Sequence, residues 1–360
     1  MNSTKKPPLV RIAKRTTVPL LQAWLIRAGG LLAALVVGSF LIIALGHNPL
    51  AVYVEMLNAA FGSRIGINET VRIAVPLLGA ALAVGMAFKM RFWNIGAEGQ
   101  ILVGAIAATY FALFHFDNMP RLVLLIVMGL AGAIAGGLWG LIPAFFRAKW
   151  GTNETLFTLM LNYIALGFII YLQSGPWRRP GETFPIIAMF DASARLPRLF
   201  GIHIGWVIVL VLTVLVYLYL SKTKQGYQIG VVGESQNTAR YAGMNVKQVI
   251  IRTMFISGAI AGLVGFIQVS GSDFTLNETT GGGVGFTAII VAWVSHLNPL
   301  IMVIMAAFIA ILQRGSTRIQ TTFMIPATIA NVLIGIILFF MLACEFFINF
   351  RVIFRGKADE

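Results

Sequence analysis

Residues 122–146 read LVLLIVMGLAGAIAGGLWGLIPAFF, an unbroken apolar run without a charged side chain. About 20 such residues are enough for an α-helix to cross the hydrocarbon core of a membrane. The sequence therefore predicts an all-α, polytopic membrane helix bundle with about ten transmembrane segments. The runs that meet this length, or nearly meet it, are 28–45, 73–88, 93–114, 122–146, 155–173, 205–220, 249–270, 284–296, 299–313 and 324–349.

The eighth and ninth of these runs differ from the others because both are short. Only Leu297 and Asn298 separate them. Irregular backbone at membrane depth is tolerated only where protein or a water-filled cavity covers it. We therefore expect broken or re-entrant pieces between 284 and 313.

The composition excludes a soluble protein and a nucleic-acid-binding protein. Of the 360 residues, 58% are hydrophobic and only 11% are charged, whereas about a quarter of a soluble domain is charged. The net charge of +14 comes mainly from Lys and Arg at the ends of the apolar runs, where it is a topology signal. We expect membrane lipid as the surroundings and no nucleic-acid partner. The one cysteine, Cys344, excludes an intrachain disulfide and a Cys-based metal site.

The distribution of Lys and Arg predicts which side of the membrane each connecting segment faces. With the N-terminus inside, two thirds of the 27 basic residues fall in cytoplasmic segments, so both termini are predicted to be cytoplasmic. Arg314 and Arg318 fall on the outer side and do not fit this pattern. The predicted organisation is a basic N-terminal segment 1–27, a transmembrane domain 28–350 with an extracytoplasmic loop 174–204 and a cytoplasmic loop 221–248, and a tail 351–360.

Two of the runs carry ladders of small residues, which allow helices to approach closely. We expect these ladders to build a compact bundle by close packing. In the fourth run they are Gly129, Ala133 and Gly137 beside Gly132, Gly136 and Gly140, and in the seventh they are Ser257, Ala261 and Gly265 beside Gly258 and Gly262.

Polar side chains open the third run, in the stretch FWNIGAEGQ at 92–100. With a helix from 93, Asn94 and Glu98 are one turn apart and share a face, while Gly96 and Gly99 leave room beside them. A carboxylate at membrane depth is costly and normally faces a cavity or a partner. Two interpretations stay open for this group: a buried cap or internal hydrogen bond, or the lining of a conduction path or its inner gate, together with the polar Gln100.

A second polar stripe starts the fifth run. Thr152 or Asn153 is expected to cap the first turn, and Glu154 complements the helix dipole. Capping does not explain Thr158 and Asn162, which continue the spacing of four residues from Glu154 through an otherwise apolar segment. The stripe must face protein or water, so it either lines the path or makes hydrogen bonds between helices.

The cytoplasmic loop contains a predicted short helix at 231–245, with Ser235 as its cap and Gly243 as its terminator. Such a helix between two spans is suited to dock into the cleft of a partner protein. The residues that we expect to make this contact are Gly233, Glu234, Asn237, Ala239, Arg240, Tyr241, Ala242 and Gly243.

A phosphate-binding loop is missing from the sequence. No G-x-x-x-x-G-K-[ST] motif occurs, and the glycines 281–283 are not followed by Lys and Ser or Thr. We expect those glycines to form a flexible turn near the outer face. The chain is therefore expected to bind no cofactor and no ATP by this route.

Together these segments resemble one family of membrane proteins. The stretch 92–100, the segment from Asn153 to Ala165, the loop from Gly233 to Gly243, and the region from Gly285 to Leu300 are similar to ABC importer permeases of the branched-chain amino acid and simple-sugar superfamily. The closest resemblance is to the nucleoside branch, whose partners are lipoproteins of the basic membrane protein type. The chain departs from the family at Ser235-Gln236, where the loop usually reads Gly-Glu-Asn-Pro, and in its basic stretch around Arg314.

The resemblance implies a permease subunit of an ATP-driven importer in the bacterial cytoplasmic (inner) membrane. ATP and Mg²⁺ would be bound by ATPase subunits docked on 231–245, and an extracytoplasmic lipoprotein would deliver the substrate. A second permease subunit, expected to be a different homologous protein, would complete the pore. Nucleosides are the expected substrates, with simple sugars and branched-chain amino acids as alternatives.

Two other classes of function compete with this interpretation. A proton-coupled secondary transporter would use Glu98 or Glu345, but it needs no docking helix. An enzyme acting within the membrane needs a paired nucleophile and base or a cluster of metal ligands, and the sequence shows neither.

Overall fold

The computed structural model describes residues 10–14 and 19–354, and most of them are helical. The chain folds into two compact units, one made of the segments up to Gly62 and from Leu312 onward, the other of Ser63–Ile311. The helices are α1 (Leu20–Ala44), α2 (Pro49–Phe61), α3 (Arg64–Lys89), α4 (Ala97–Phe114), α5 (Arg121–Trp150), α6 (Glu154–Ser174), α7 (Gly205–Lys222), α8 (Lys224–Glu234), α9 (Gln236–Tyr241), α10 (Val246–Gln268), α11 (Val284–Val294), α12 (Pro299–Thr322) and α13 (Ala327–Asn349). The short elements are β1 (Val10–Lys14), η1 (Ala192–Ala194), β2 (Arg198–Leu199), β3 (Ile202–His203), the π-helical turn η2 (Val269–Asp273) and β4 (Phe350–Phe354).

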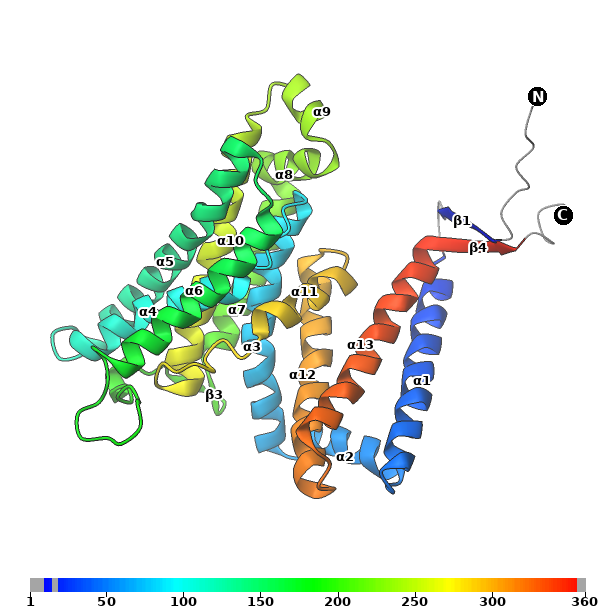
Figure 1. Cartoon of the computed structure of the whole chain (residues 1–360), viewed down its shortest axis with the longest axis horizontal. Helices are drawn as coiled ribbons and strands as arrows, with labels where there is room; N and C mark the ends of the chain where they lie inside the picture. Colours follow the sequence, from blue (N-terminus) through cyan, green and yellow to red (C-terminus); the bar gives the residue numbers. More distant parts are fainter. Residues whose placement is uncertain (1–9, 15–18, 355–360) are drawn as a thin grey trace. The chain divides into compact units, whose positions relative to one another are not determined.

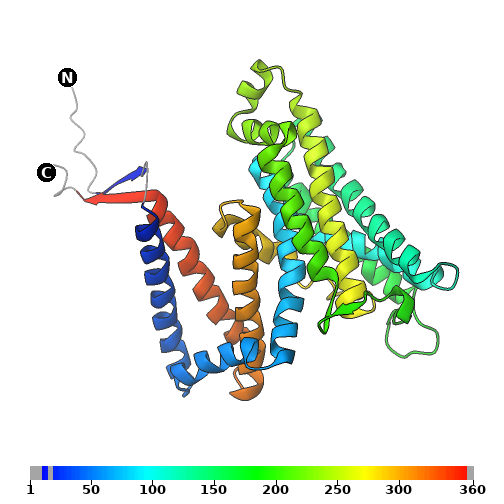
Figure 2. The ribbon, with the colours of Figure 1, turned by 180° about the vertical axis from the view of Figure 1, so that it is seen from behind.

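The first unit brings the two ends of the described chain together. Strands β1 and β4 pair antiparallel, and α1 packs against α13 (Figure 1 and Figure 2). Arg27 on α1 forms an ion pair with Glu345 on α13, with 2.9 Å between Nε and Oε1. Both ends therefore leave this unit on the same side, as the predicted topology requires.

The second unit is built on close contacts between α4, α5 and α10. The two predicted ladders of small residues face each other here. A Cβ atom built on Gly262 would overlap the carbonyl oxygen of Gly132, and one on Gly258 would overlap that of Gly136. On another side of α10, the hydroxyl of Ser257 donates to the carbonyl of Ala83 on α3 at 2.7 Å. The ladders thus allow backbone to pack on backbone.

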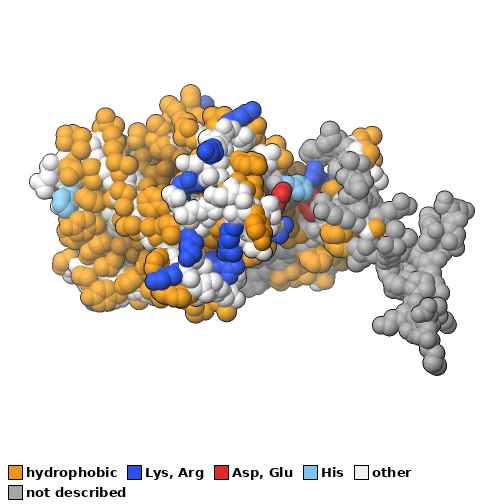
Figure 3. Space-filling view, turned by 90° about the horizontal axis from the view of Figure 1, so that it is seen from above, with side chains coloured by type: hydrophobic (Ala, Val, Ile, Leu, Met, Phe, Trp, Pro, Cys, Tyr) orange, Lys and Arg blue, Asp and Glu red, His pale blue; other side chains and the backbone are white. Residues whose placement is uncertain are grey.

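The two ends of this unit carry different structures. Helices α8 and α9 form one end, and the loop 175–204 with β2 and β3 lies at the other (Figure 1). Figure 3 looks down on the end with α8 and α9, where Lys and Arg side chains gather. The predicted extracytoplasmic and cytoplasmic loops therefore lie at opposite ends of the unit.

Within the described residues, nine helices are long and apolar enough to cross a membrane, which confirms a polytopic helical membrane protein. The prediction that 299–313 is a short broken piece is wrong, because α12 continues to Thr322. Arg314 and Arg318 lie inside this helix rather than in a loop. Its polar second half is held by α2, where Glu55 pairs with Arg318 at 2.8 Å and Met56 packs on Gly315. Among the ten predicted runs, the one at 284–296 forms a helix too short to cross, α11 with 11 residues.

The first helix begins at Leu20, earlier than the expected start of the transmembrane domain at 28. Arg27 therefore belongs to α1, although we assigned it to the basic segment before the membrane domain. Its ion pair with Glu345 explains how the helix accommodates this charge.

Candidate functional site

The segment before α4 is not helical, and this changes the expected position of Asn94. The helix begins at Ala97, so the prediction that Asn94 and Glu98 share a helical face is wrong. The side chain of Asn94 instead folds back and accepts a hydrogen bond from the backbone N–H of Gly96 at 3.0 Å. This local bond competes with the helix and delays its start.

Gln100 completes the anchoring of this turn. The amide Nδ2 of Asn94 donates to Oε1 of Gln100 at 3.2 Å, and both side chains are buried. A Cβ atom on Gly140 of α5 would come within 3.1 Å of the Gln100 side chain. The amide pair therefore lies between the turn, α4 and α5.

The polar stripe of α6 bonds to the backbone of the same turn. Thr158 accepts from the N–H of Ile95 at 3.2 Å. Asn162 accepts from the N–H of Gly99 at 2.8 Å and donates to the carbonyl of Ile95 at 3.0 Å. A Cβ atom on Gly99 would lie 2.8 Å from the Asn162 side-chain oxygen, so this glycine leaves the room that the sequence predicted. The polar side chains of α6 are thus satisfied by the backbone of this turn and of the first residues of α4.

Glu98 points to a different element, the start of α11. Its carboxylate accepts from the backbone N–H of Gly283 at 2.9 Å and from that of Gly285 at 2.6 Å. The N-terminus of a helix favours a negative charge because its first N–H groups have no partner within the helix. The structure thus joins α4 to α11 through one buried carboxylate.

The glycines 281–283 are therefore not the flexible outer turn that we predicted. A Cβ atom on Gly281 would overlap the Glu98 carboxylate, while Gly282 and Gly283 adopt positive φ angles of 57° and 75°. The residues thus form a close-fitting cradle whose anion is supplied by the chain itself. The glycine-rich stretch is visible in the sequence, but its partner, the carboxylate of Glu98, lies far away along the chain.

Glu154 lies outside this group and has a partner that the sequence analysis missed. Asn153 caps α6 as expected, accepting from the N–H groups of Thr155 and Leu156. The Glu154 carboxylate pairs with Arg147 of α5, with 3.2 Å between Oε2 and Nε. This ion pair closes the turn between α5 and α6.

All six residues that we expected in a path or gate are buried, with exposed fractions of at most 8%. One group, formed around the turn before α4, contains Asn94, Gln100, Thr158 and Asn162. Glu98 connects the start of α4 to α11, and Glu154 pairs with Arg147 of α5. In this arrangement they hold helices together. The hydrogen-bonding alternative left open by the sequence describes their geometry.

Two tryptophans beside this cluster were missed by the sequence analysis. The indole rings of Trp93 and Trp293 stack with their centroids 5.6 Å apart and an angle of 22° between their planes. They are 42% and 44% exposed, although the neighbouring Phe88 and Asn94 are buried. The pair places a flat aromatic surface next to the polar cluster.

The predicted docking helix 231–245 is in fact two helices. Helix α8 ends at Glu234, and α9 begins after Ser235, whose extended backbone breaks the helix and whose hydroxyl accepts from the N–H of Thr238 at 3.2 Å. Gly243 follows with a φ of 74°, which favours glycine. The cap and the terminator are thus confirmed, while the continuous helix is wrong.

The eight expected docking residues divide into two groups. Gly233 and Ala239 are buried, and Gly233 packs on the carbonyl of Lys89 at the end of α3. The exposed ones are Glu234, Asn237, Arg240, Tyr241, Ala242 and Gly243. Tyr241 is 94% exposed, an unusual position for a large aromatic side chain. The exposed face of α9 is therefore the part of the loop that is available to a partner.

Comparison with known proteins places this architecture in a family. The family described as branched-chain amino acid transport system, permease component, matches residues 66–342. The glucose ABC transporter permease protein TsgB13 of Haloferax volcanii is 33% identical, over 95% of this chain and 93% of its own. The guanosine ABC transporter permease protein NupP of Bacillus subtilis is 31% identical, over 86% and 90%.

A third relative, the nucleoside ABC transporter permease protein NupB of Lactococcus lactis subsp. cremoris, is 30% identical over 87% of this chain and 88% of its own. The family match spans the polar cluster, the glycine cradle and α9 alike. Together with the membrane-spanning helices they identify a multi-pass integral protein of the inner membrane. The chain belongs to the family of ABC importer permeases that includes the branched-chain amino acid permeases.

Proposed function

We propose that this chain is the permease subunit of a nucleoside importer. The observation that carries this proposal is the similarity to a guanosine permease and a nucleoside permease over 86% and 87% of the chain. A simple sugar is the second candidate, because a glucose permease is 33% identical over 95% of the chain. Nucleosides and simple sugars are both neutral and polar, and each has a flat or apolar face.

The surface next to the polar cluster supports a substrate of this kind. The stacked pair Trp93 and Trp293 exposes indole rings on which a nucleobase can stack. The group around Asn94 and Asn162 carries amides rather than unpaired charges, which suits a neutral solute. We therefore place the translocation path, with its inner gate, along this cluster and the glycine cradle.

Substrate uptake separates the two candidates. We expect the complete complex in proteoliposomes, supplied with its binding protein and ATP, to accumulate labelled guanosine. Unlabelled nucleosides should reduce this uptake, whereas glucose and leucine in the same excess should not. Competition by glucose, or uptake of labelled glucose alone, would reject nucleosides and support the sugar.

The partners follow from the same proposal. ATPase subunits would dock on the exposed face of α9, a second and different permease subunit would complete the path, and an extracytoplasmic lipoprotein would deliver the substrate. Lys and Arg side chains gather at the end of the unit that carries α8 and α9 (Figure 3), as expected for a cytoplasmic surface. Docking of an ATPase there would fix the orientation of the whole chain, with the loop 175–204 outside.

Replacement of Tyr241 tests this docking surface. Exposed aromatic side chains are frequent anchors of protein interfaces, where truncation often costs 2 kcal/mol or more, about thirtyfold in affinity. We expect Tyr241→Ala to weaken ATPase binding by about tenfold or more and to abolish stimulation of ATP hydrolysis by loaded binding protein. Copurification of the ATPase with the permease, and its stimulated activity, measure the two effects.

Tyr171→Ala is the matched control, because Tyr171 is also exposed, at 66%, but lies on α6 toward the opposite end of the unit. It should bind the ATPase normally. A change at Ala239 of the same helix, such as Ala239→Glu, cannot test docking, since Ala239 is buried and the new charge would disturb folding. Normal ATPase binding by Tyr241→Ala would remove α9 from the proposed interface.

A further inference from the structure

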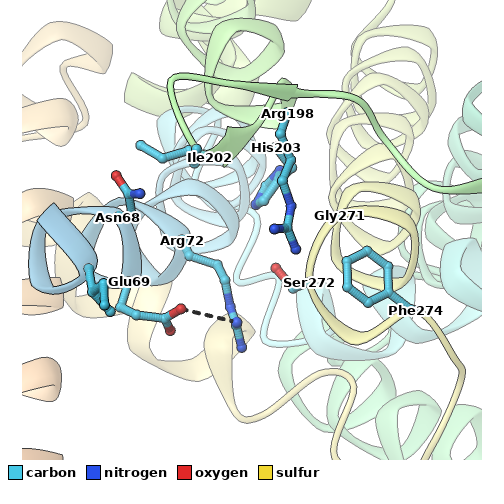
Figure 4. Close-up of a pocket in the computed structure, with 11 residues that line it drawn as sticks. Asn68, Glu69, Arg72, Arg198, Ile202, His203, Gly271, Ser272 and Phe274 are labelled. Atoms are coloured by element: carbon cyan, nitrogen blue, oxygen red, sulfur yellow. Dashed lines mark hydrogen bonds and ion pairs between the residues drawn. The ribbon is translucent and has the colours of Figure 1, made fainter.

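A small polar pocket lies at the end of the second unit opposite α8 and α9 (Figure 4). It is formed by the first turns of α3, the hairpin of β2 and β3, and the turn that follows α10. The cavity has a volume of about 140 Å³, which is room for several water molecules or one small anion. None of its residues belongs to the polar cluster, the glycine cradle or the docking face.

His203 forms the buried wall of this pocket. It is 3% exposed, and neither ring nitrogen has a hydrogen-bond partner among the residues that the structure describes. Gly205 and Gly271 leave room for the ring, since a Cβ atom on either would come within 2.7 Å of Nδ1. A buried polar group without a partner is costly, so such a group in a pocket points to a ligand or to water.

The other polar groups in the pocket are mainly hydrogen-bond donors. The hydroxyl of Ser272 is also buried and has no partner in the described part of the chain. Figure 4 shows Arg72 and Arg198 in the same pocket as His203 and Ser272. Arg198 is exposed, and no described residue forms a hydrogen bond or ion pair with its guanidinium, which carries five N–H donors.

The two acidic groups near the pocket both act on Arg72. Glu69 accepts from Arg72 at 3.4 Å, in a contact exposed to solvent. Asp273, at the end of the turn after α10, is close enough to interact with the charge of Arg72. Burial, and then the charges of Arg72 and Arg198, lower the pKa of His203 to about 4. The imidazole is therefore neutral at pH 7, and the two charges that act on it are those of Arg72 and Arg198.

We propose that this pocket binds a small oxyanion, a phosphate or carboxylate group held by Arg198, Ser272 and His203. Arg198 would supply charge-assisted hydrogen bonds, which guanidinium forms readily with planar or tetrahedral oxyanions. The hydroxyl of Ser272 would donate a hydrogen bond to the anion, and the single N–H of the neutral His203 imidazole would donate another. The anion is either dissolved in the surrounding solution or part of a lipid headgroup, because both present the same oxygen atoms.

Histidine NMR on the full-length protein tests the proposal, because the chain has only four histidines. With ¹⁵N-labelled histidine in lipid-free detergent, inorganic phosphate at constant ionic strength should shift the His203 signals. It should also raise the His203 pKa, since a bound negative charge stabilises the imidazolium. Arg198→Gln should weaken the apparent phosphate affinity by about tenfold or more, because a charged hydrogen-bond partner is lost.

Arg179→Gln is the control for this variant. Arg179 carries the same charge on the exposed loop of the same end, outside the pocket, so its removal should leave the phosphate response unchanged. A parallel titration with acetate shows whether a carboxylate is accepted as well as phosphate. The proposal is overturned if neither anion changes the His203 signals, or if Arg198→Gln responds like the unmodified protein.

Nanodiscs of phosphatidylglycerol distinguish the two sources of the oxyanion. A phosphate response that persists in nanodiscs identifies a soluble anion as the ligand. A response that occurs in detergent and disappears in nanodiscs, where the His203 signals already match the phosphate-bound form, identifies a lipid headgroup. Both results support an oxyanion site.

Discussion

Replacement of Gly262 by alanine should prevent the second unit from packing, although the chain should still insert into the membrane. The new methyl group would overlap the carbonyl oxygen of Gly132 on α5 and approach the Cα atom of Gly136 within 3.0 Å. Both neighbours are backbone, so neither can rotate away as a side chain would. Overpacking typically costs about 1–3 kcal/mol where side chains can adjust, and we expect a cost at or above the upper end here.

The measurement is the yield of monodisperse protein after detergent extraction, together with its thermal stability. Gly167→Ala is the matched control, because a Cβ atom on Gly167 of α6 would meet nothing within 4 Å. Alanine is favoured over glycine by up to about 1 kcal/mol in a helix, so this variant should be as stable as the original protein or more so. If Gly262→Ala folded equally well, α5 and α10 would not be in the close contact described here.

The membrane-spanning helices were predictable because hydrophobic length alone determines them. The same criterion failed where a helix continues beyond its apolar part. In α12 the last turns are polar, and they stay helical because Glu55 and Met56 on α2 bind Arg318 and pack on Gly315. Such stabilisation depends on a partner that is far away in the sequence, so a local count of apolar residues ends the helix too early.

The polar cluster shows the same limit at a finer scale. The sequence predicts that Asn94, Glu98 and Asn162 need partners, and all three are buried and hydrogen-bonded. The prediction that Asn94 and Glu98 share a face is wrong, because a side-chain bond to Gly96 delays the helix. The partner of Glu98 was also hidden, since the cradle around Gly283 lies 185 residues further along the chain. Residue type predicts that a polar group needs a partner, whereas only the fold determines which partner it has.

The break between α8 and α9 was visible in the sequence and was interpreted incorrectly. Ser235 was assigned as a cap inside one longer helix, yet a capping residue must itself be outside the helix that it caps. Its extended backbone ends α8 and starts α9. The consequence for function is a smaller docking element, whose exposed face is centred on Tyr241.

The contact between Glu98 and α11 leads to the prediction with the clearest consequence for transport. Glu98→Gln preserves the size of the side chain but leaves one acceptor oxygen for the two N–H groups of Gly283 and Gly285, and it turns an amide donor toward one of them. Loss of a hydrogen bond to a charged group costs about 1.5–3 kcal/mol. The start of α11 should therefore detach about ten to a hundred times more often.

If this contact belongs to the inner gate, the Glu98→Gln complex should assemble at normal levels and hydrolyse ATP, while the substrate accumulated per ATP falls by about tenfold. The measurement combines uptake and ATP hydrolysis in proteoliposomes with the yield of intact complex. Glu278→Gln, an exposed carboxylate in the loop before the cradle, should behave like the original protein. Asn162→Leu removes both bonds to the turn at Ile95 and Gly99, so it should lower the yield. The contrary outcome is that Glu98→Gln behaves like Asn162→Leu, with a lower yield of complex and an unchanged amount of substrate accumulated per ATP. That result would show that both residues only hold the helices together.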